Sequence, residues 1–200
     1  MGTDNLLVDY FSQYISLSEE EIQLIKEENI IRDYAKGDIL LKEGQLAKEC
    51  FLVLKGCVKR YYLEDGEEKI MEFYTENDPI APVSYATKKP SKYYLSCVEP
   101  SIISTGTEER TERFLRDFPH FIPAFLKIGD TLSAKKQIIA DSFKNLSPEK
   151  RYLKLLEDRP DLANRVPQYM LASYLGIKPE SLSRIRKRLY SRKLIAPQNP

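Results

Sequence analysis

The residues whose types and spacing best support a specific chemistry lie at positions 167–189. Pro167 and Pro179 each begin a short predicted helix, because proline fits the first turn, where its missing N–H costs nothing. Gly176 ends the first helix, since glycine accepts the positive φ of a tight turn. Small Ala172 lets the two helices cross closely. This spacing is typical of a helix-turn-helix, whose second helix enters the major groove of DNA.

The second predicted helix separates an apolar face from a polar one. At about 100° per residue, its apolar positions join those of the first helix in one core: Leu171, Leu175, Ile177, Leu182, Ile185 and Leu189. On the opposite face, a carboxylate can accept a hydrogen bond from cytosine N4, and an arginine can donate to guanine O6 and N7. We therefore expect base contacts from Glu180, Ser183, Arg184 and Lys187. The alternative is a helical hairpin with an ordinary solvated basic face.

The charge of the chain is uneven. Residues 166–200 hold seven bases and one acid (+6), and residues 1–165 hold 24 bases and 29 acids (−5), although the whole chain carries +1. A concentrated positive charge favours a polyanionic partner, with a solvated basic tail as the alternative. Lys178 and Ser181 lie near the start of the second helix, where backbone N–H groups and the helix dipole favour phosphate. We expect phosphate contacts from both.

A long helix is predicted before this region. Its apolar residues repeat every seven positions, with an intermediate position filled twice: Phe118, Phe121, Phe125, Ile128, Leu132, Ile139 and Leu146. Such a heptad-like stripe favours a dimer seam, for which we expect contacts from Phe125, Ile128, Leu132 and Ile139. The alternative is packing on the chain's own barrel, and the two are compatible. Ser147-Pro148 begins a further helix that ends at Arg159-Pro160, followed by a connector at 161–165.

The N-terminal half is predicted to form helix followed by strands. Residues 4–30 have helical spacing, with a second helix start at Ser18 before three glutamates. Short strand-like runs then alternate with turn signals over residues 31–103, and Asp65-Gly66 is a good hairpin signal. Strands at roughly ten-residue spacing predict an antiparallel barrel or sandwich. Residues 78–91, which contain three prolines, are expected to form a loop.

Composition argues against several classes of protein. No apolar run approaches the ~20 residues that span a bilayer, and no basic stretch followed by an apolar one begins the chain, so we expect a cytoplasmic protein without membrane contact. One histidine and three cysteines without a CxxC pair exclude a disulfide framework and the usual metal clusters. An enzyme is not expected, because no nucleophile is paired with a base and no glycine-rich phosphate loop is present.

The single histidine and the cysteines are expected to be structural. His120 follows a proline, and a haem-sensing role for it is conceivable but not favoured. Cys50, Cys57 and Cys97 lie in strand-like segments and are expected to be buried packing residues, with a thiol redox sensor as the alternative.

The order of parts resembles the Crp–Fnr family of bacterial transcription regulators over nearly the whole chain. The resemblance rests on a barrel repeat and a recognition unit, carried by residues 36–40, 43–44, 51–59, 65–66 and 175–184. It implies an α+β fold: an antiparallel jelly-roll (double-stranded β-helix) sensor domain at 1–117, a dimerisation helix at 118–146, and a winged-helix-like helix-turn-helix domain at 147–200. It also implies that Glu180 and Arg184 read bases and that Tyr169 lies near phosphates.

The same resemblance implies the partners. They are a second copy of the chain, a palindromic operator in double-stranded DNA, and RNA polymerase. The competing interpretation is a ligand-binding or protein-interaction module whose basic C-terminus contacts a partner other than DNA.

The sequence departs from the family in its sensor. Members that bind cyclic AMP hold it with a Gly-Glu pair and an Arg-Ser/Thr-Ala triplet. Residues 78–83 contain no Gly-Glu, and Ser91-Lys92-Tyr93 has no arginine and a bulky tyrosine in place of alanine. Because a desolvated phosphate needs a paired cation, we expect no cyclic AMP binding. No cofactor is expected, and another small-molecule effector remains open.

Two further departures concern metal sensing and the C-terminal end. No cysteine precedes Cys50, so an N-terminal iron–sulfur group is not expected. Residues 194–200 are too few for the second strand of a wing, so we expect a truncated wing.

Overall fold

In a computed structural model, residues 4–27 and 30–192 are described. The described residues fall into two compact units: those up to Leu63 together with Glu72–Asp130, and Glu64–Met71 together with those from Thr131 onward. The second unit therefore combines a short segment from the middle of the chain with the C-terminal helices. The expected wing falls on residues 194–200, outside the described residues, and the bounds of the three domains drawn from the sequence stay predictions.

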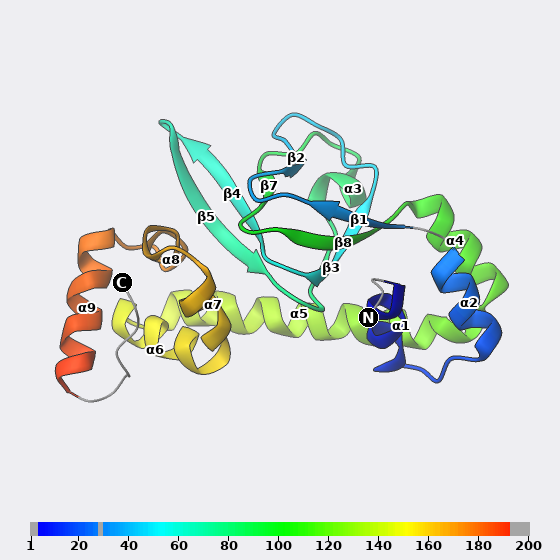
Figure 1. The fold of residues 1–200 in the computed structure, drawn as a ribbon. Coiled ribbons are helices and arrows are strands. Elements are labelled where there is room, and N and C mark those ends of the chain that lie inside the picture. Colours follow the sequence, from blue (N-terminus) through cyan, green and yellow to red (C-terminus); the bar gives the residue numbers. More distant parts are fainter. Residues whose placement is uncertain (1–3, 28–29, 193–200) are drawn as a thin grey trace. The chain divides into compact units, whose positions relative to one another are not determined.

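The first unit is built on two four-stranded sheets (Figure 1). The order in one sheet is β1 (Ile31–Tyr34), β8 (Ser101–Gly106), β3 (Cys50–Lys55) and β6 (Pro79–Ile80). The order in the other is β2 (Ile39–Leu41), β7 (Tyr94–Cys97), β4 (Val58–Glu64) and β5 (Glu67–Tyr74). The resolved pairings are antiparallel, which confirms the expected jelly-roll-like domain of an α+β fold.

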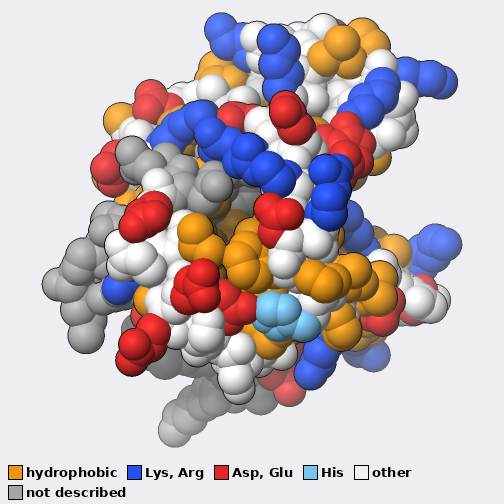
Figure 2. Space-filling view, turned by 90° about the vertical axis from the view of Figure 1, so that its right-hand side faces the viewer, with side chains coloured by type: hydrophobic (Ala, Val, Ile, Leu, Met, Phe, Trp, Pro, Cys, Tyr) orange, Lys and Arg blue, Asp and Glu red, His pale blue; other side chains and the backbone are white. Residues whose placement is uncertain are grey.

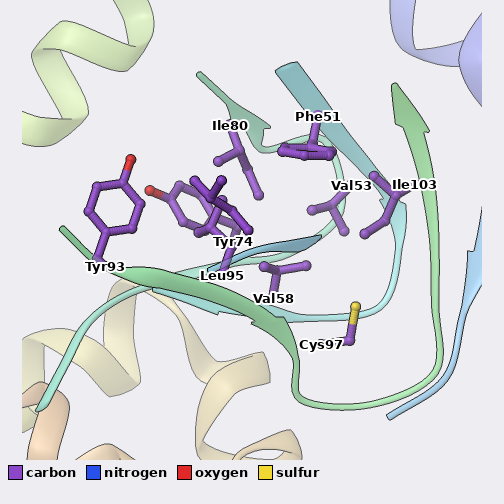
Figure 3. Packing of buried hydrophobic residues seen from close by; sticks show 10 residues of the cluster. Phe51, Val53, Val58, Tyr74, Ile80, Tyr93, Leu95, Cys97 and Ile103 are labelled. Atoms are coloured by element: carbon purple, nitrogen blue, oxygen red, sulfur yellow. The ribbon is translucent and has the colours of Figure 1, made fainter. Parts of the chain in front are cut away.

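Ten buried residues, drawn from strands of both sheets and from Tyr93, form the main core of the first unit (Figure 3). In the pairing of β3 with β8, Val53 lies opposite Ile103, and neither is exposed. Tyr74 and Tyr93 lie side by side at one end of this cluster. The interior therefore consists of aliphatic and aromatic side chains.

Two turns require the residues that occupy them. Asp65 and Gly66 have φ of 51° and 80°, the pair of positive angles that a two-residue hairpin turn of the primed type needs. The predicted hairpin is thus confirmed between β4 and β5. Gly56 has φ of 106°, and a Cβ there would lie 2.7 Å from the Cα of Ser101, so only glycine fits.

The N-terminal helices α1 (Asp4–Ser12) and α2 (Glu19–Glu27) pack on the other face of β3. There, Leu7, Tyr10 and Ile25 form a second buried cluster with Leu52 and Leu54 of the strand. The helix start predicted at Ser18 is confirmed as a reciprocal cap. The Glu21 carboxylate accepts from the backbone N–H of Ser18 at 2.8 Å, and the Ser18 hydroxyl accepts from that of Glu21 at 3.3 Å.

The segment expected to be a loop is partly regular, so that prediction is wrong in part. It contains strand β6 and the short helix α3 (Val83–Thr87). Pro82, the residue before α3, has the extended conformation of a helix N-cap. The prolines mark element ends rather than irregular chain.

The long helix starts later than its heptad pattern indicated. Helix α4 (Glu108–Asp117) ends before Phe118, and the 3-10 turn Pro119–Phe121 separates it from α5 (Ile122–Asn145). Pro119 cannot donate a backbone hydrogen bond, so α4 cannot continue through it. Phe118 and Phe121 therefore precede the long helix instead of lying on it.

Four short helices complete the second unit: α6 (Pro148–Asp158), α7 (Pro160–Arg165), α8 (Gln168–Tyr174) and α9 (Pro179–Ser191). The predicted cap of α6 is confirmed, since the Ser147 hydroxyl accepts from the backbone N–H of Lys150 at 3.4 Å. The connector expected at 161–165 is wrong. Pro160 ends one helix and also begins the next, whose Leu162 and Ala163 are buried. No helix among those described combines the length and apolarity needed to cross a membrane.

Candidate nucleic-acid interface

The turn between α8 and α9 is held by backbone hydrogen bonds. Gly176 has φ of 68°, and the Ile177 N–H donates to the Ala172 carbonyl at 3.0 Å. The Ala172 side chain is fully buried, so any larger side chain would force the two helices apart. The local geometry is that of the helix-turn-helix predicted from the sequence.

Helix α9 presents the two faces that its sequence indicated. Leu182, Ile185 and Leu189 are 1%, 8% and 0% exposed. The predicted base-contacting residues are all exposed on the helix: Glu180, Ser183, Arg184 and Lys187. The polar surface is therefore accessible, and its contact with bases stays a prediction.

The residues expected to meet phosphates surround the start of α9. Lys178 is the residue before the first helical turn and is exposed, and Tyr169 on α8 is 57% exposed. Ser181 is half-buried, and its hydroxyl accepts from the Arg184 guanidinium at 3.4 Å. Lys178, Ser181 and Arg184 thus follow one another at intervals of three residues, from the N-cap of α9 into its second turn.

Not all of the basic charge of α9 is available to a partner, which the sequence did not indicate. Arg188 forms an ion pair with Glu149 of α6. Arg186 hydrogen-bonds to Tyr152, whose pKa is raised by burial and lowered in part by this arginine. These two arginines anchor the helix to its own unit. The sequence signal for them is that Arg186 directly follows buried Ile185 and Arg188 directly precedes buried Leu189.

Arg151 is a second anchor that sequence reasoning missed. Its guanidinium donates to the carbonyls of Leu146 and Phe143 at 3.1 and 3.4 Å, beyond or near the end of α5, and to that of Leu175 at 2.9 Å, after α8. It also lies over the Phe143 ring, 5.1 Å from the centroid. One side chain therefore ties the long helix to the helix-turn-helix.

The residues expected at a dimer seam are all half-buried within one chain. The Phe125 ring lies 6.0 Å from that of Phe11, and Ile128 packs against the cluster between α1 and β3. Other apolar residues of α5 are more exposed, with Leu126 at 65% and Ile138 at 55%. The seam stays a prediction, and part of its stripe already contacts the chain's own first unit.

A half-buried polar cluster lies beside Tyr93 in the first unit. The Tyr93 hydroxyl accepts from the backbone N–H of Val83, the first residue of α3, at 2.8 Å. The Arg60 guanidinium lies over the Tyr93 ring at 5.4 Å and pairs with Glu72 at 3.2 Å. Glu72 also accepts from the Tyr74 hydroxyl at 2.7 Å, and burial raises the pKa of that phenol. The Val83–Tyr93 hydrogen bond thus joins the two segments, residues 78–83 and 91–93, in which the sequence departs from members that bind cyclic AMP.

An open groove of about 640 Å³ lies elsewhere in the first unit. It is lined by the loop before β3, by α3 and by the start of α4, and its charged side chains are Lys48, Lys88, Glu108, Glu109 and Glu112. Lys88 and Glu108 form an ion pair across it. The charges of opposite sign leave no dominant field for an anionic or cationic ligand.

The cysteines and the histidine are placed as packing and surface residues. Cys57 and Cys97 are buried and Cys50 is half-buried, and burial raises the pKa of the Cys50 thiol to about 11. His120 lies at the surface beside an apolar patch (Figure 2) and pairs with Glu21 at 2.6 Å. Across the described part of the chain, no group of three or more acidic, cysteine or histidine side chains could hold a metal ion.

Comparison with known proteins gives a domain match and a set of similar folds. Residues 31–117 match the model of the cyclic nucleotide-binding domain. FixK2 from Bradyrhizobium japonicum has a TM-score of 0.71 at 14% identity over 85% of this chain and 88% of its own. A CooA mutant from Carboxydothermus hydrogenoformans has 0.65 at 17% identity, over 84% and 79%.

The c-di-GMP-responsive global regulator CLP of Xanthomonas campestris gives a similar result. Its TM-score is 0.63 at 19% identity, over 84% of this chain and 90% of its own. No curated protein sequence matches the chain. The comparisons therefore show a cyclic nucleotide-binding domain at residues 31–117 and, over most of the chain, the fold of FixK2, CooA and CLP, which is the fold expected from the Crp–Fnr resemblance.

Proposed function

We propose that this chain is a sequence-specific DNA-binding transcription regulator that acts as a homodimer. The single observation that carries the proposal is the polar face of α9, where Glu180, Arg184 and Lys187 are exposed on a helix whose opposite face is buried. A helix fixed on one side and polar on the other fits the major groove, which is about 12 Å wide.

The side chains of α9 support both base and phosphate contacts. Arg184 can donate two parallel hydrogen bonds to guanine, and Glu180 can accept from cytosine N4. Ser183 and Lys187 lie on the same exposed face for neighbouring bases. Tyr169, Lys178 and Ser181 would contact the backbone, which fixes the register of the helix without reading sequence.

Dimerisation would follow from α5. Leu132 and Ile139 continue the seam proposed through Phe125 and Ile128, and exposed Leu126 and Ile138 enlarge the apolar surface available to a second copy. Two recognition helices related by two-fold symmetry read half-sites about 34 Å apart, so the operator would be palindromic. Such a regulator would act in the cytoplasm, would contact RNA polymerase, and would carry out no catalysis.

The sensor domain would not bind cyclic AMP as its relatives do. Tyr93 is buried beside α3, and its hydroxyl already accepts from the Val83 N–H, so this N–H already has an acceptor and is not available to an incoming phosphate. The nearby cation, Arg60, is paired with Glu72. Calorimetric titration with cyclic AMP should therefore give no binding at micromolar concentrations, and micromolar affinity at this domain would contradict the assignment. Any effector would be a different small molecule.

Selection from a pool of random duplexes tests the DNA function. We expect a palindromic consensus, bound as a dimer, with affinity that falls steeply as salt rises. Arg184→Ala should cost about 1–3 kcal/mol and relax preference at one base pair in each half-site. Arg192→Ala, an exposed arginine after α9, is the matched control for loss of one positive charge. Equal binding of all duplexes by parent and Arg184→Ala would remove the role given to Arg184.

A ligand-binding or protein-interaction module is the second candidate. It is favoured only by the basic charge of the C-terminal residues, which any polyanion could recognise. That module would show no consensus in the selection and no dependence on Arg184 at a particular base pair.

A further inference from the structure

The tip of the β4–β5 hairpin is strongly acidic. Residues 64–69 read Glu-Asp-Gly-Glu-Glu-Lys, with four carboxylates and one ammonium. This tip belongs to the compact unit of the C-terminal helices and not to that of the sheets. An anionic loop therefore shares a unit with the helix-turn-helix.

Ser173 fastens the tip to α8. Its hydroxyl donates to the Glu68 carbonyl at 2.9 Å and accepts from the Ile70 N–H at 3.0 Å. These two groups flank one residue of β5, which is the edge strand of its sheet. One hydroxyl thus supplies both the donor and the acceptor that a neighbouring strand would have offered there.

The attachment is specific to this position of the helix. Ile70 is only 3% exposed, so its N–H would be left buried without an acceptor if Ser173 lost its hydroxyl. Ser173 is three residues before Gly176, whose turn leads directly into α9. The anchored strand and the recognition helix are therefore separated by a single short turn.

The acidic tip lies close enough to α9 to act on its charge. Lys69, and to a smaller extent Lys178, the residue before the first turn of α9, lower the pKa of Glu67. Glu67 also pairs with Lys69 at 2.8 Å. Lys178 is one of the residues proposed above to meet a phosphate, so a carboxylate and a phosphate would compete for the same cation.

We propose that the β4–β5 hairpin tip is an autoinhibitory acidic surface, held by Ser173 against the phosphate-facing side of the helix-turn-helix. The proposal rests on the DNA function proposed above. Carboxylates near the DNA backbone repel it, and they also neutralise a cation that would otherwise release counterions from the duplex. Detachment of the tip from Ser173 raises the affinity for DNA.

Removal of tip charge is the first test. The variant Glu64→Gln/Glu67→Gln loses two exposed carboxylates of the tip, and Glu109→Gln/Glu112→Gln loses two exposed carboxylates of α4 in the other unit. The probe is a labelled 30-base-pair duplex of random sequence, because phosphate attraction does not depend on the operator. At ~50 mM salt the tip variant should bind about three- to tenfold tighter than the parent, and the α4 variant less than twofold tighter.

Salt separates this electrostatic effect from a change of conformation. The Debye length falls from about 14 Å at ~50 mM salt to about 5–6 Å at ~300 mM salt. The difference between the tip variant and the parent should therefore shrink to less than twofold at the higher concentration. Equal gains for the tip and α4 variants would mean that only total charge matters and would overturn the proposal.

Loss of the Ser173 hydroxyl is the second test. In Ser173→Ala, hydrogen exchange at the Ile70 amide should accelerate at least tenfold, and the duplex should bind tighter than to the parent. Ser173→Thr keeps the hydroxyl and should restore slow exchange. Exchange in α6, around buried Tyr152, reports whether the unit stays folded. Adding Glu64→Gln/Glu67→Gln to Ser173→Ala should give less than twofold further gain, since a released tip no longer lies near α9.

The outcomes distinguish this proposal from the DNA function. A parent that binds no duplex at ~50 mM salt would remove the DNA function itself. A parent that binds, with an unchanged affinity in the tip variant or in a folded Ser173→Ala, would leave the DNA function intact and refute autoinhibition.

Discussion

Replacement of Tyr93 tests whether the interior of the sensor domain is occupied by its own side chains. Tyr93→Phe keeps the ring, which is 4% exposed, and removes only the hydroxyl that accepts from Val83 at 2.8 Å. The net contribution of one such hydrogen bond is about 1 kcal/mol. Tyr93→Ala also removes the ring, and deletion of a buried aromatic side chain costs about 3–5 kcal/mol.

The assay is equilibrium unfolding by urea, followed by far-ultraviolet circular dichroism and by tyrosine fluorescence. Two probes are needed because the two compact units need not unfold together. Tyr190→Phe is the matched control, since Tyr190 is 53% exposed and its hydroxyl should contribute close to zero. The expected order of stability is Tyr190→Phe equal to the parent, then Tyr93→Phe, then Tyr93→Ala.

The size of the Tyr93→Ala effect shows whether the interior of the sensor domain is occupied by its own side chains. A loss below about 1 kcal/mol would mean that the ring is poorly packed, because that is less than the transfer free energy of its buried surface. The interior would then be a deformable pocket, and the argument against cyclic AMP would fail. A loss of several kcal/mol supports an occupied interior.

Three further predictions concern other parts of the chain. Arg151→Ala should lower the unfolding free energy of the second unit by about 2–4 kcal/mol, because it leaves three helix-end carbonyls without their charged donor, and Arg151→Lys should recover only part of it in urea titrations. The N–H of Ser18, with His120 nearby, holds the pKa of Glu21 below its usual value, so this carboxylate contributes stability that is lost as pH falls through the folded-state pKa. Glu21→Gln should flatten the decline in melting temperature between about pH 5 and pH 3, and an unchanged slope would show that other carboxylates cause it. Cys50, with a pKa raised to about 11, should react with iodoacetamide on the order of tenfold to a hundredfold more slowly than a free thiol, as measured by intact mass with the unfolded protein as reference.

Local signals in the sequence predicted local structure well. Asp65-Gly66 specifies its hairpin because both residues accept positive φ, and Ser18 and Ser147 specify helix starts through their own hydroxyl groups. The same reasoning identified α9, since its apolar residues repeat at helical spacing. In each case the cause and the structure lie within a few residues.

Predictions that depended on a single reading of proline were less successful. The sequence predicts a helix end at Arg159-Pro160, but Pro160 fits equally well at the first position of α7. Pro119 interrupts a heptad pattern that runs through it unchanged in the sequence. The sequence predicts strands over residues 31–103, and the shortest of them, β6, has no signal of its own. With only two residues, β6 is defined by its pairing with β3 rather than by its own composition.

The sequence predicts which residues are exposed at the candidate interface, but it does not predict how much positive charge they leave for a partner. The sequence locates Glu180, Ser183, Arg184 and Lys187 on one face, and they are exposed there. It does not indicate that Arg188 is paired with Glu149, because that ion pair joins residues 39 positions apart. A count of charges over residues 166–200 therefore overstates the charge that a partner would meet.

A charge count along the sequence also cannot show which residues the hairpin tip lies beside, and the net charge of the tip is negative. An acidic loop between two strands is ordinary in composition, and the role proposed for it depends on a serine 103 positions away from Ile70. The Debye length is about 8 Å in physiological salt, so the charges that act on α9 are those within about that distance, whatever their place in the chain. Ser173 holds the backbone of the tip on α8, so the proposed effect of the tip carboxylates on DNA depends on its hydroxyl.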